Sequence, residues 1–255
     1  MLKQLRSWRH GFSLALSERL RGSRGTYLER PAGRLTQVGP QQQGRIAELA
    51  ARYDISFEYS LSAETALRNY EYLDLLDRAF AAGSEVVPRP KILCDAGCAS
   101  FWYAAALSAF FQPGRLIGVD VEGYRRLQGG HTRIDYARGY LASLGHGEFV
   151  VVDYRRLVQP AEVITSFFPF ISPLAVLAWR LPLSLLDPPS FFAQVHRNLR
   201  LGGVFFMVNH GPAEAARAHQ YCDAAGLACI LRLDHAGVLS GHRSAAALPS
   251  LWRTV

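Results

Sequence analysis

Two acidic residues about 25 positions apart each close a short apolar run in the middle of the chain. Asp95 ends the run Lys-Ile-Leu-Cys-Asp, and Asp120 ends the run Arg-Leu-Ile-Gly-Val-Asp. A tight turn at Gly97 and a helix-length apolar segment separate them, which is the pattern of a strand, a helix and a second, parallel strand. In such a unit, a carboxylate that ends the second strand can accept hydrogen bonds from both hydroxyls of a ribose. These residues therefore predict a site for a ligand that contains a nucleoside.

The segment Asp95-Ala-Gly97-Cys-Ala99, followed by Gly-Val-Asp120, resembles the first two motifs of the class I S-adenosylmethionine-dependent methyltransferases. The loop of that family reads D-x-G-x-G-x-G. This chain keeps the Asp and the first Gly, and it has Ala99 and Phe101 at the other two Gly positions. The later acid stands in the register that a ribose contact needs. The resemblance implies S-adenosylmethionine as the cofactor.

The resemblance also implies which residues bind that cofactor: Asp95, Gly97, Ala99, Asp120, Asp153 and Tyr154. Asp120 would hold the ribose, and Gly97 would let the backbone approach the methionine moiety, where a Cβ would obstruct it. Asp95 would reach the cationic amino acid that carries the sulfonium, directly or through water. Asp153 closes a third apolar run and would serve the adenine amino group, and Tyr154 could stack on the ring. Each of these residues also has a structural interpretation, as a turn glycine or as an acid that caps a turn or a helix.

Ala99 and Phe101 are the departures that separate an active enzyme from a non-catalytic relative. Ala99 adds one methyl group and is tolerated if its φ stays negative. The ring of Phe101 could fill the space of the methionine tail or could pack into the core. Because the helix that follows needs an apolar face, we expect the ring to pack away and the cofactor pocket to stay open.

Histidine is the residue type best suited to assist methyl transfer, an in-line displacement that depends mainly on positioning. His210 follows the fifth predicted strand and is our candidate catalytic base, with His131 second. A lone histidine is more often a surface or capping residue, and this alternative stays open. The sequence contains no apparent serine triad, carboxylate pair or zinc-type cluster, so we predict no metal site.

Residues 166–170 argue against nucleic-acid bases as methyl acceptors. Amino-directed nucleic-acid methyltransferases carry Asn/Asp-Pro-Pro-aromatic after the fourth strand, where this chain reads Ser-Phe-Phe-Pro-Phe. The apolar segment 167–192 lies between the fourth strand and its helix, at the edge of the sheet where substrates bind. It suits an apolar acceptor, but core packing or a dimer face is the alternative that we slightly favour.

The order of the remaining elements predicts the fold. Helices are expected at 99–111, 123–144 with a break near 129–130, 190–199 and 212–225, and strands at 91–95, 115–120, 148–153, 162–167, 201–209, 227–233 and 246–255. A chain that ends on a strand after strand six matches the methyltransferase sheet, whose seventh strand inserts antiparallel between strands five and six. We therefore predict an α/β fold at residues 89–255, a doubly wound, mostly parallel seven-stranded sheet of the Rossmann-like methyltransferase type. The resemblance covers residues 91–255.

Residues 1–88 are predicted to form a helical and irregular N-terminal extension, with a helical cap. Residues 1–25 carry apolar side chains at helical spacing and several arginines. This segment could contact an anionic membrane peripherally, but we favour packing on the main domain or on a partner. Residues 22–44 are predicted to be a loop, and residues 45–53 and 64–82 to be helices. The first of these two resembles the opening of a helix-turn-helix, but no recognition helix follows it.

Composition narrows the functional class further. The chain has 255 residues, 49% of them hydrophobic, and a formal charge of +7, yet its only lysines are Lys3 and Lys91. The excess of arginine and alanine is typical of a GC-rich bacterial genome, so basicity is no argument for nucleic acid. The four cysteines, at positions 94, 98, 222 and 229, are expected to be buried thiols in a reducing cytoplasm. No transmembrane run or secretory signal is expected.

The sequence as a whole predicts a cytoplasmic methyltransferase, membrane-peripheral if residues 1–25 bind lipid, that acts on a small or lipid-like apolar acceptor. A non-catalytic scaffold or partner-binding relative is the alternative, favoured by the loss of two loop glycines. A nucleotide-dependent oxidoreductase is disfavoured by the missing dinucleotide-binding glycine pattern. The sequence leaves open whether the protein forms a homodimer.

Overall fold

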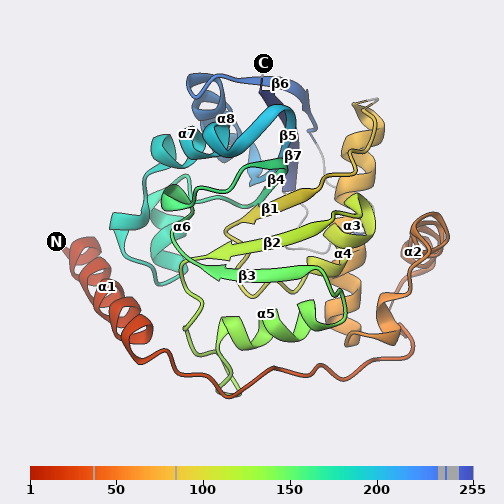
Figure 1. Cartoon of the computed structure of the whole chain (residues 1–255), viewed down its shortest axis with the longest axis horizontal. Helices are drawn as coiled ribbons and strands as arrows, with labels where there is room; N and C mark the ends of the chain where they lie inside the picture. The colour runs from red at the N-terminus through yellow and green to blue at the C-terminus, as the bar shows by residue number, and fades with distance from the viewer. Residues whose placement is uncertain (37, 84, 235–238, 240–246, 255) are drawn as a thin grey trace.

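A seven-stranded sheet forms the centre of the computed structural model, which describes residues 1–36, 38–83, 85–234, 239 and 247–254. The strands are β1 Ile92–Ala96, β2 Arg115–Asp120, β3 Gly147–Val151, β4 Ala161–Phe167, β5 Leu199–His210, β6 Leu227–Arg232 and β7 Ala247–Thr254. Their order is β3-β2-β1-β4-β5-β7-β6, and β7 runs antiparallel to both of its neighbours (Figure 1). The predicted fold, including the inserted seventh strand, is confirmed. Residues 246 and 255 of the predicted last strand lie outside the described residues.

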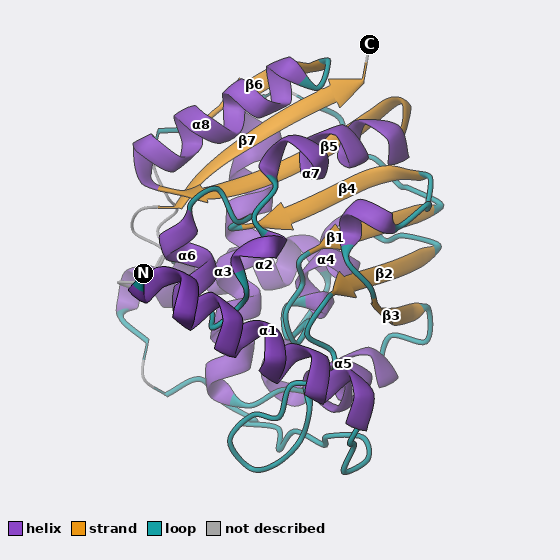
Figure 2. Ribbon diagram, turned by 90° about the vertical axis from the view of Figure 1, so that its left-hand side faces the viewer, coloured by secondary structure: helices purple, strands orange, loops and turns teal. Residues whose placement is uncertain are grey.

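Helices cover both faces of the sheet (Figure 2). They are α1 Leu2–Leu20, α2 Pro40–Tyr53, α3 Ala63–Ala82, α4 Ala104–Phe111, α5 Arg133–Ala142, α6 Pro173–Ala178, α7 Pro188–Asn198 and α8 Gly211–Ala224, with 3₁₀ turns at Phe57–Tyr59, Tyr154–Arg156 and Leu183–Leu185. Alternate strand residues serve the two faces: Leu93 packs in the core under α3 and α4, and Cys94 in the core under α7. Since both faces are buried, the parallel strands read as continuous apolar runs.

Two predicted helices begin later in the structure than in the sequence prediction. The helix expected from residue 99 begins at Ala104, because residues 97–103 form a loop. The helix expected from residue 123 is α5, which begins after Thr132. A reciprocal capping box between Thr132 and Asp135 fixes this start.

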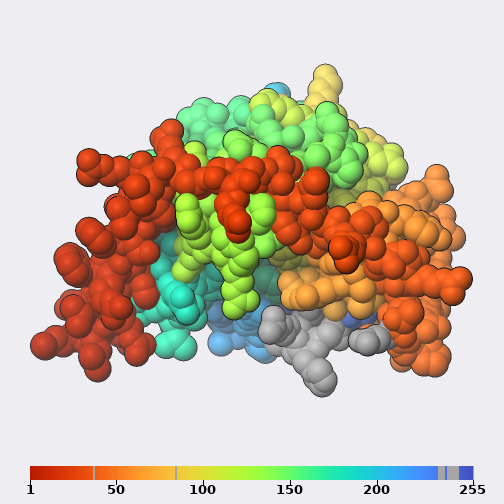
Figure 3. All heavy atoms as spheres, turned by 90° about the horizontal axis from the view of Figure 1, so that it is seen from below, coloured from red at the N-terminus to blue at the C-terminus, as the bar shows by residue number. Residues whose placement is uncertain are grey.

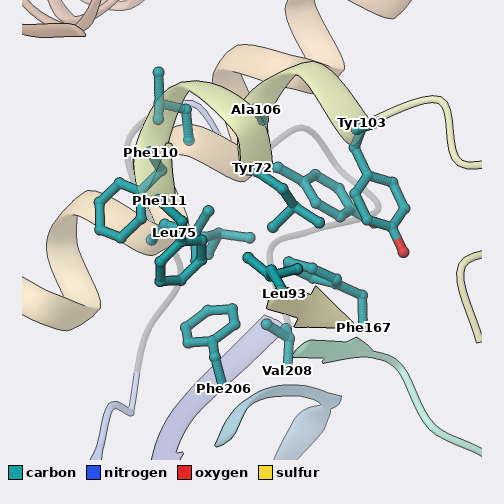
Figure 4. Close-up of a cluster of buried hydrophobic side chains, with 14 of the residues drawn as sticks. Tyr72, Leu75, Leu93, Tyr103, Ala106, Phe110, Phe111, Phe167, Phe206 and Val208 are labelled. Carbon is teal, nitrogen blue, oxygen red and sulfur yellow. The ribbon is translucent and has the colours of Figure 1, made fainter. Parts of the chain in front are cut away.

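Helix α3 is part of the main core, although it precedes the predicted boundary at residue 88. From α3, Tyr72 packs its ring 4.4 Å from the rings of Tyr103 and Phe167, and Leu75 belongs to the same buried cluster (Figure 4). Asn69, fully buried, donates to the Trp102 carbonyl at 2.9 Å and accepts from the Ala106 N–H at 2.9 Å. These bonds attach α3 to the start of α4. The division at residue 88 stays a prediction.

The N-terminal segment lies along the outside of the domain (Figures 1 and 3). Residues 22–36 run past α5, where the Tyr27 ring packs 4.2 Å from that of Tyr136. The apolar stripe of α1 does not pack on the main domain, because α1 has no buried residue, whereas the contact with a partner stays a prediction. None of the described helices is long and apolar enough to cross a membrane.

The cysteines are free thiols in the structure. Cys94, Cys98 and Cys222 are buried as expected, whereas Cys229 on β6 is exposed. The expectation of burial is wrong for Cys229 because β6 is the edge strand, and several of its side chains face solvent.

Candidate functional site

A cavity of about 640 Å³ lies at the carboxyl ends of the parallel strands. Its lining includes residues that end or directly follow all five of them: Ala96 and Gly97, Asp120 and Val121, Val152 and Asp153, Phe167 and Phe168, and His210. This is the edge at which open α/β sheets bind ligands. The cavity therefore occupies the predicted position.

The loop 97–103 holds three left-handed residues at the spacing of the family's glycines, although only the first of them is glycine. Gly97, Ala99 and Phe101 have φ values of +84°, +54° and +55°. The condition under which alanine is readily tolerated at position 99, a negative φ, is therefore not met. Non-glycine residues in this left-handed region cost roughly 1–2 kcal/mol each, so the surrounding structure must hold them there.

Phe101 packs away from the cavity, as predicted. Its side chain is fully buried and does not line the cavity. The ring lies against Gly118 of β2, where an added Cβ would come within 2.4 Å of Phe101 Cδ1. Gly118 therefore makes the room that the Phe101 ring occupies, and the pocket stays open.

Gly97 faces open space at the floor of the cavity. An added Cβ would meet no atom within 4 Å, and Gly97 itself lines the cavity. Its N–H donates to the Val119 carbonyl at 2.9 Å, which ties the loop to β2. The backbone at this position is thus accessible to a ligand.

Asp120 joins two loops at the centre of the site. Its Oδ2 accepts from the Ala99 N–H at 2.9 Å, and its Oδ1 accepts from the Glu122 N–H at 2.8 Å. Each carboxylate oxygen has further lone-pair capacity, so these bonds leave acceptors for two hydroxyls. The carboxylate lines the cavity in the position predicted for a ribose contact.

Asp95 lies behind the loop and does not line the cavity. Its carboxylate is fully buried and accepts from the hydroxyls of Tyr103 and Thr165, each at 2.5 Å. Burial raises the pKa of Asp95 to about 7, against the opposing effect of these two hydrogen bonds. Tyr103, which does line the cavity, connects Asp95 to it.

Asp153 and Tyr154, which were predicted to contact the adenine, both have contacts within the protein. Arg155 Nε donates to both Asp153 oxygens at 3.0 Å, and although burial opposes ionisation, these bonds lower the pKa of Asp153. Tyr154 packs its ring 5.5 Å from that of Phe191, and its hydroxyl accepts from Asn198 Nδ2 at 3.4 Å. Both residues line the cavity, but Asp153 is paired and the Tyr154 ring belongs to the core under α7.

Many of the other residues that line the cavity are aromatic. They are Tyr72, Trp102, Tyr103, Phe167, Phe168, Phe170 and Trp179. The His210 ring stacks on Phe168 with centroids 3.8 Å apart and an interplanar angle of 12°. His131 lies elsewhere, with Nδ1 3.3 Å from the Gly25 carbonyl, so the two histidine candidates do not share a site.

Sequence reasoning missed the contributions of α3 and α8. Arg68, Glu71 and Tyr72 line the cavity from α3, and Glu214 lines it from the first turn of α8. The available signal was a helix whose face mixes charged and aromatic residues three and four positions apart. No motif marks that pattern as part of a site.

The charge of the lining is opposite to that of the chain. Seven carboxylate residues line the cavity, against two arginines, Arg68 and Arg155. Both arginines are already paired, Arg68 with Glu64 at 2.5 Å and Arg155 with Asp153. The whole chain, by contrast, has a formal charge of +7. The lining is thus acidic, although arginines partly compensate its charge by pairing with Glu64, Glu122, Asp153 and Asp187.

Comparison with solved structures identifies proteins that share this fold. No family model matches the sequence, and no curated protein matches it. Among solved structures, the N-methyltransferase NodS from Bradyrhizobium japonicum WM9, in complex with S-adenosyl-L-homocysteine, superposes with a TM-score of 0.53 at 13% identity, covering 82% of this chain and 98% of that one. Geranyl diphosphate C-methyltransferase from Streptomyces coelicolor gives 0.52 at 12% identity, covering 91% and 90%. An S-adenosylmethionine-dependent methyltransferase from Aquifex aeolicus gives 0.52 at 13% identity, covering 74% and 97%.

These matches cover 74–91% of this chain and 90–98% of each neighbour. The resemblance read from Asp95, Gly97 and Asp120 is thus confirmed at the level of the fold. The chain has the fold of the class I S-adenosylmethionine-dependent methyltransferases.

Proposed function

We propose that this protein is an S-adenosylmethionine-dependent methyltransferase whose acceptor is a small or lipid-like apolar molecule without negative charge. The observation that carries the proposal is Asp120, which lines the cavity and hydrogen-bonds to a loop that retains three left-handed residues. Ala99 and Phe101 are left-handed at the two positions where the family motif has glycine, which supports a loop that still works through its backbone.

The described residues fit the cofactor. Asp120 would accept hydrogen bonds from the ribose hydroxyls, the open backbone at Gly97 would lie against the methionine moiety, and residues 152–154 would border the adenine. The carboxylates of the lining favour a ligand that carries a sulfonium and an ammonium group. When bound, S-adenosylmethionine supplies an electrophilic methyl group, and the chain's own task is to align an acceptor with it.

The acceptor half of the cavity supports the apolar part of the proposal. Its aromatic walls, including Tyr72, Phe170 and Trp179, bury apolar surface, and Glu71 and Glu214 stand among them. Two like charges 4 Å apart repel by roughly 4 kcal/mol at the effective dielectric of a partly buried site. A diphosphate acceptor, which the Streptomyces coelicolor neighbour holds together with Mg2+, would need a cation between its phosphates and these carboxylates. An amine or an uncharged apolar molecule would not.

His210 is the residue we propose as the base for an acceptor that must lose a proton. Its ring is held by Phe168 at the end of β5, beside the start of α8. A methyl-transfer assay on a His210→Gln variant tests this role, with unchanged cofactor affinity as the control.

Calorimetric titration with S-adenosylhomocysteine tests the proposed function. We expect binding to the unmodified protein and a rise in Kd of about ten- to a hundredfold in Asp120→Ala, because hydrogen bonds to a charged group contribute roughly 1.5–3 kcal/mol. Asp223→Ala, a change on α8 outside the cavity lining, is the matched control and should bind normally. Thermal melting of both variants separates lost binding from lost folding.

Absence of binding at millimolar S-adenosylhomocysteine would favour the alternative, a scaffold that keeps the fold without the cofactor. Equal affinity in Asp120→Ala and in the unmodified protein would remove Asp120 from the site. The open cavity and the buried Phe101 ring are the reasons to prefer the enzyme.

A further inference from the structure

Helix α1 presents an apolar face to solvent in a fixed orientation. Its larger apolar side chains recur every three or four residues, and each of them is between 44% and 77% exposed: Leu2, Leu5, Trp8, Phe12, Leu16 and Leu20. The partly buried residues lie on the opposite side of the helix: Ser7, His10, Gly11, Leu14 and Ser17. A surface helix in a globular protein normally shows the reverse arrangement.

Specific contacts hold the helix in this orientation. Ser7 Oγ accepts a hydrogen bond from the Leu183 N–H at 2.8 Å. An added Cβ at Gly11 would lie 3.5 Å from Pro182 Cβ, so the helix backbone passes close to the 3₁₀ turn at this point. The polar side of α1 is thus the side attached to the domain.

The charges of α1 indicate what the apolar face contacts. Lys3, Arg6, Arg9 and Arg19 are exposed on the helix, which contains one acid, Glu18. Within the described part of the chain, none of these four basic side chains forms an ion pair. Arginine and lysine side chains beside an apolar stripe can extend to the phosphates of a lipid surface while the stripe enters the acyl boundary.

Exposed apolar side chains also lie on the neighbouring helix α6 and at the cavity. Helix α6 contacts α1 and carries the exposed Leu174, and Trp179 at its end is both 47% exposed and part of the cavity lining. Figure 2 views this side of the molecule, with α1 in front of the domain. In Figure 3, α1 projects from the body of the protein.

We propose that α1 docks the protein on an anionic membrane surface, with its apolar stripe inserted among the lipids and its basic side chains on the headgroups. Docking by this face places the Trp179 side of the cavity next to the lipid. The interaction does not depend on a bound cofactor, so it can be tested separately from the proposed function.

Vesicle sedimentation with the full chain tests the proposal. The protein should sediment with vesicles of phosphatidylcholine and phosphatidylglycerol and remain in solution with vesicles of phosphatidylcholine alone. Arg6→Gln/Arg9→Gln should weaken binding about twenty-fivefold, since each basic residue near an anionic surface strengthens binding about fivefold. Trp8→Glu/Phe12→Glu should abolish it, and added salt should weaken it.

Leu201→Glu is the matched control, because Leu201 is 85% exposed near the amino end of β5, whereas the cavity lies at the carboxyl ends of the strands. It should bind vesicles like the unmodified protein. All variants should melt alike, because the substituted side chains are exposed. Equal sedimentation with both vesicle types, or normal binding by Trp8→Glu/Phe12→Glu, would overturn the proposal. A dimer in solution that Trp8→Glu/Phe12→Glu dissociates would also overturn it, because the stripe would then join two copies of the chain.

Discussion

Two neighbouring segments at the same edge of the sheet contribute to the cavity in opposite ways. The first part of the loop after β1, residues 97–101, offers backbone, because Cys98 and Phe101 are fully buried while Gly97 is open; Trp102 and Tyr103 at its end add side chains. The segment 168–187 follows β4, the next strand in the sheet, and offers side chains such as Phe170 and Trp179. A loop that acts through its backbone can change its residues if its φ values are kept. A segment that acts through side chains depends on their identity.

Both segments hold non-glycine residues in the left-handed region. Ala99 and Phe101 do so in the first, and Phe168 has a φ of +59° in the second. The Phe101 N–H donates to the Cys98 carbonyl and the Phe168 N–H to the Val208 carbonyl, each at 2.8 Å. Hydrogen bonding and packing together offset the strain. The comparison predicts that substitutions in the first loop affect stability most, and those in the second affect the acceptor.

The largest effect is expected for Phe101→Ala. Removing a fully buried ring should lower the free energy of unfolding by about 3–5 kcal/mol, measured by urea denaturation. Phe168→Ala is the control from the other segment, and because its ring is partly exposed it should cost less than about 1.5 kcal/mol. Similar losses in the two variants would contradict the assignment of Phe101 to the core.

A smaller effect is expected from the titration of Asp95 beneath the loop. Its folded pKa, about 7, lies above its ordinary value of 3.8, so the folded state binds the proton more tightly. Asp95 therefore stabilises the fold most at low pH. This stabilisation falls by roughly 1.4 kcal/mol per pH unit as the pH rises from 3.8, the ordinary pKa, to about 7, the pKa in the folded state. Between pH 5 and pH 8 the unmodified protein should lose about 2–3 kcal/mol more than Asp95→Asn does. Parallel pH profiles of the two proteins would show that Asp95 ionises normally in the fold.

The sequence predicted the sheet and its strand-end acids because both depend on local patterns. Apolar runs closed by Asp95 and Asp120 mark buried parallel strands, and the position of the last strand fixes its antiparallel insertion. These features need no knowledge of distant contacts.

The remaining features depend on contacts between segments that are distant in sequence. Gly118 on β2 makes the room for Phe101, and Asn69 on α3 holds the start of α4, which brings Tyr72 into the cavity wall. The orientation of α1 depends on a turn more than 170 residues away, through the bond between Ser7 and Leu183. The pairing of Asp153 with Arg155 is local, but no sequence motif announces it.

The smallest effect, Ala99→Gly, tests directly whether the loop acts through its backbone. Glycine adopts a φ of +54° without the steric cost that alanine bears, but it loses more conformational entropy on folding. The balance should raise the free energy of unfolding by about 0.5–1 kcal/mol and leave the affinity for S-adenosylhomocysteine unchanged. Ala109→Gly, in the right-handed turns of α4, should instead lower it by about 0.5–1 kcal/mol. Opposite signs in the two variants would establish that residue 99 needs a left-handed conformation and tolerates alanine only because the loop imposes it.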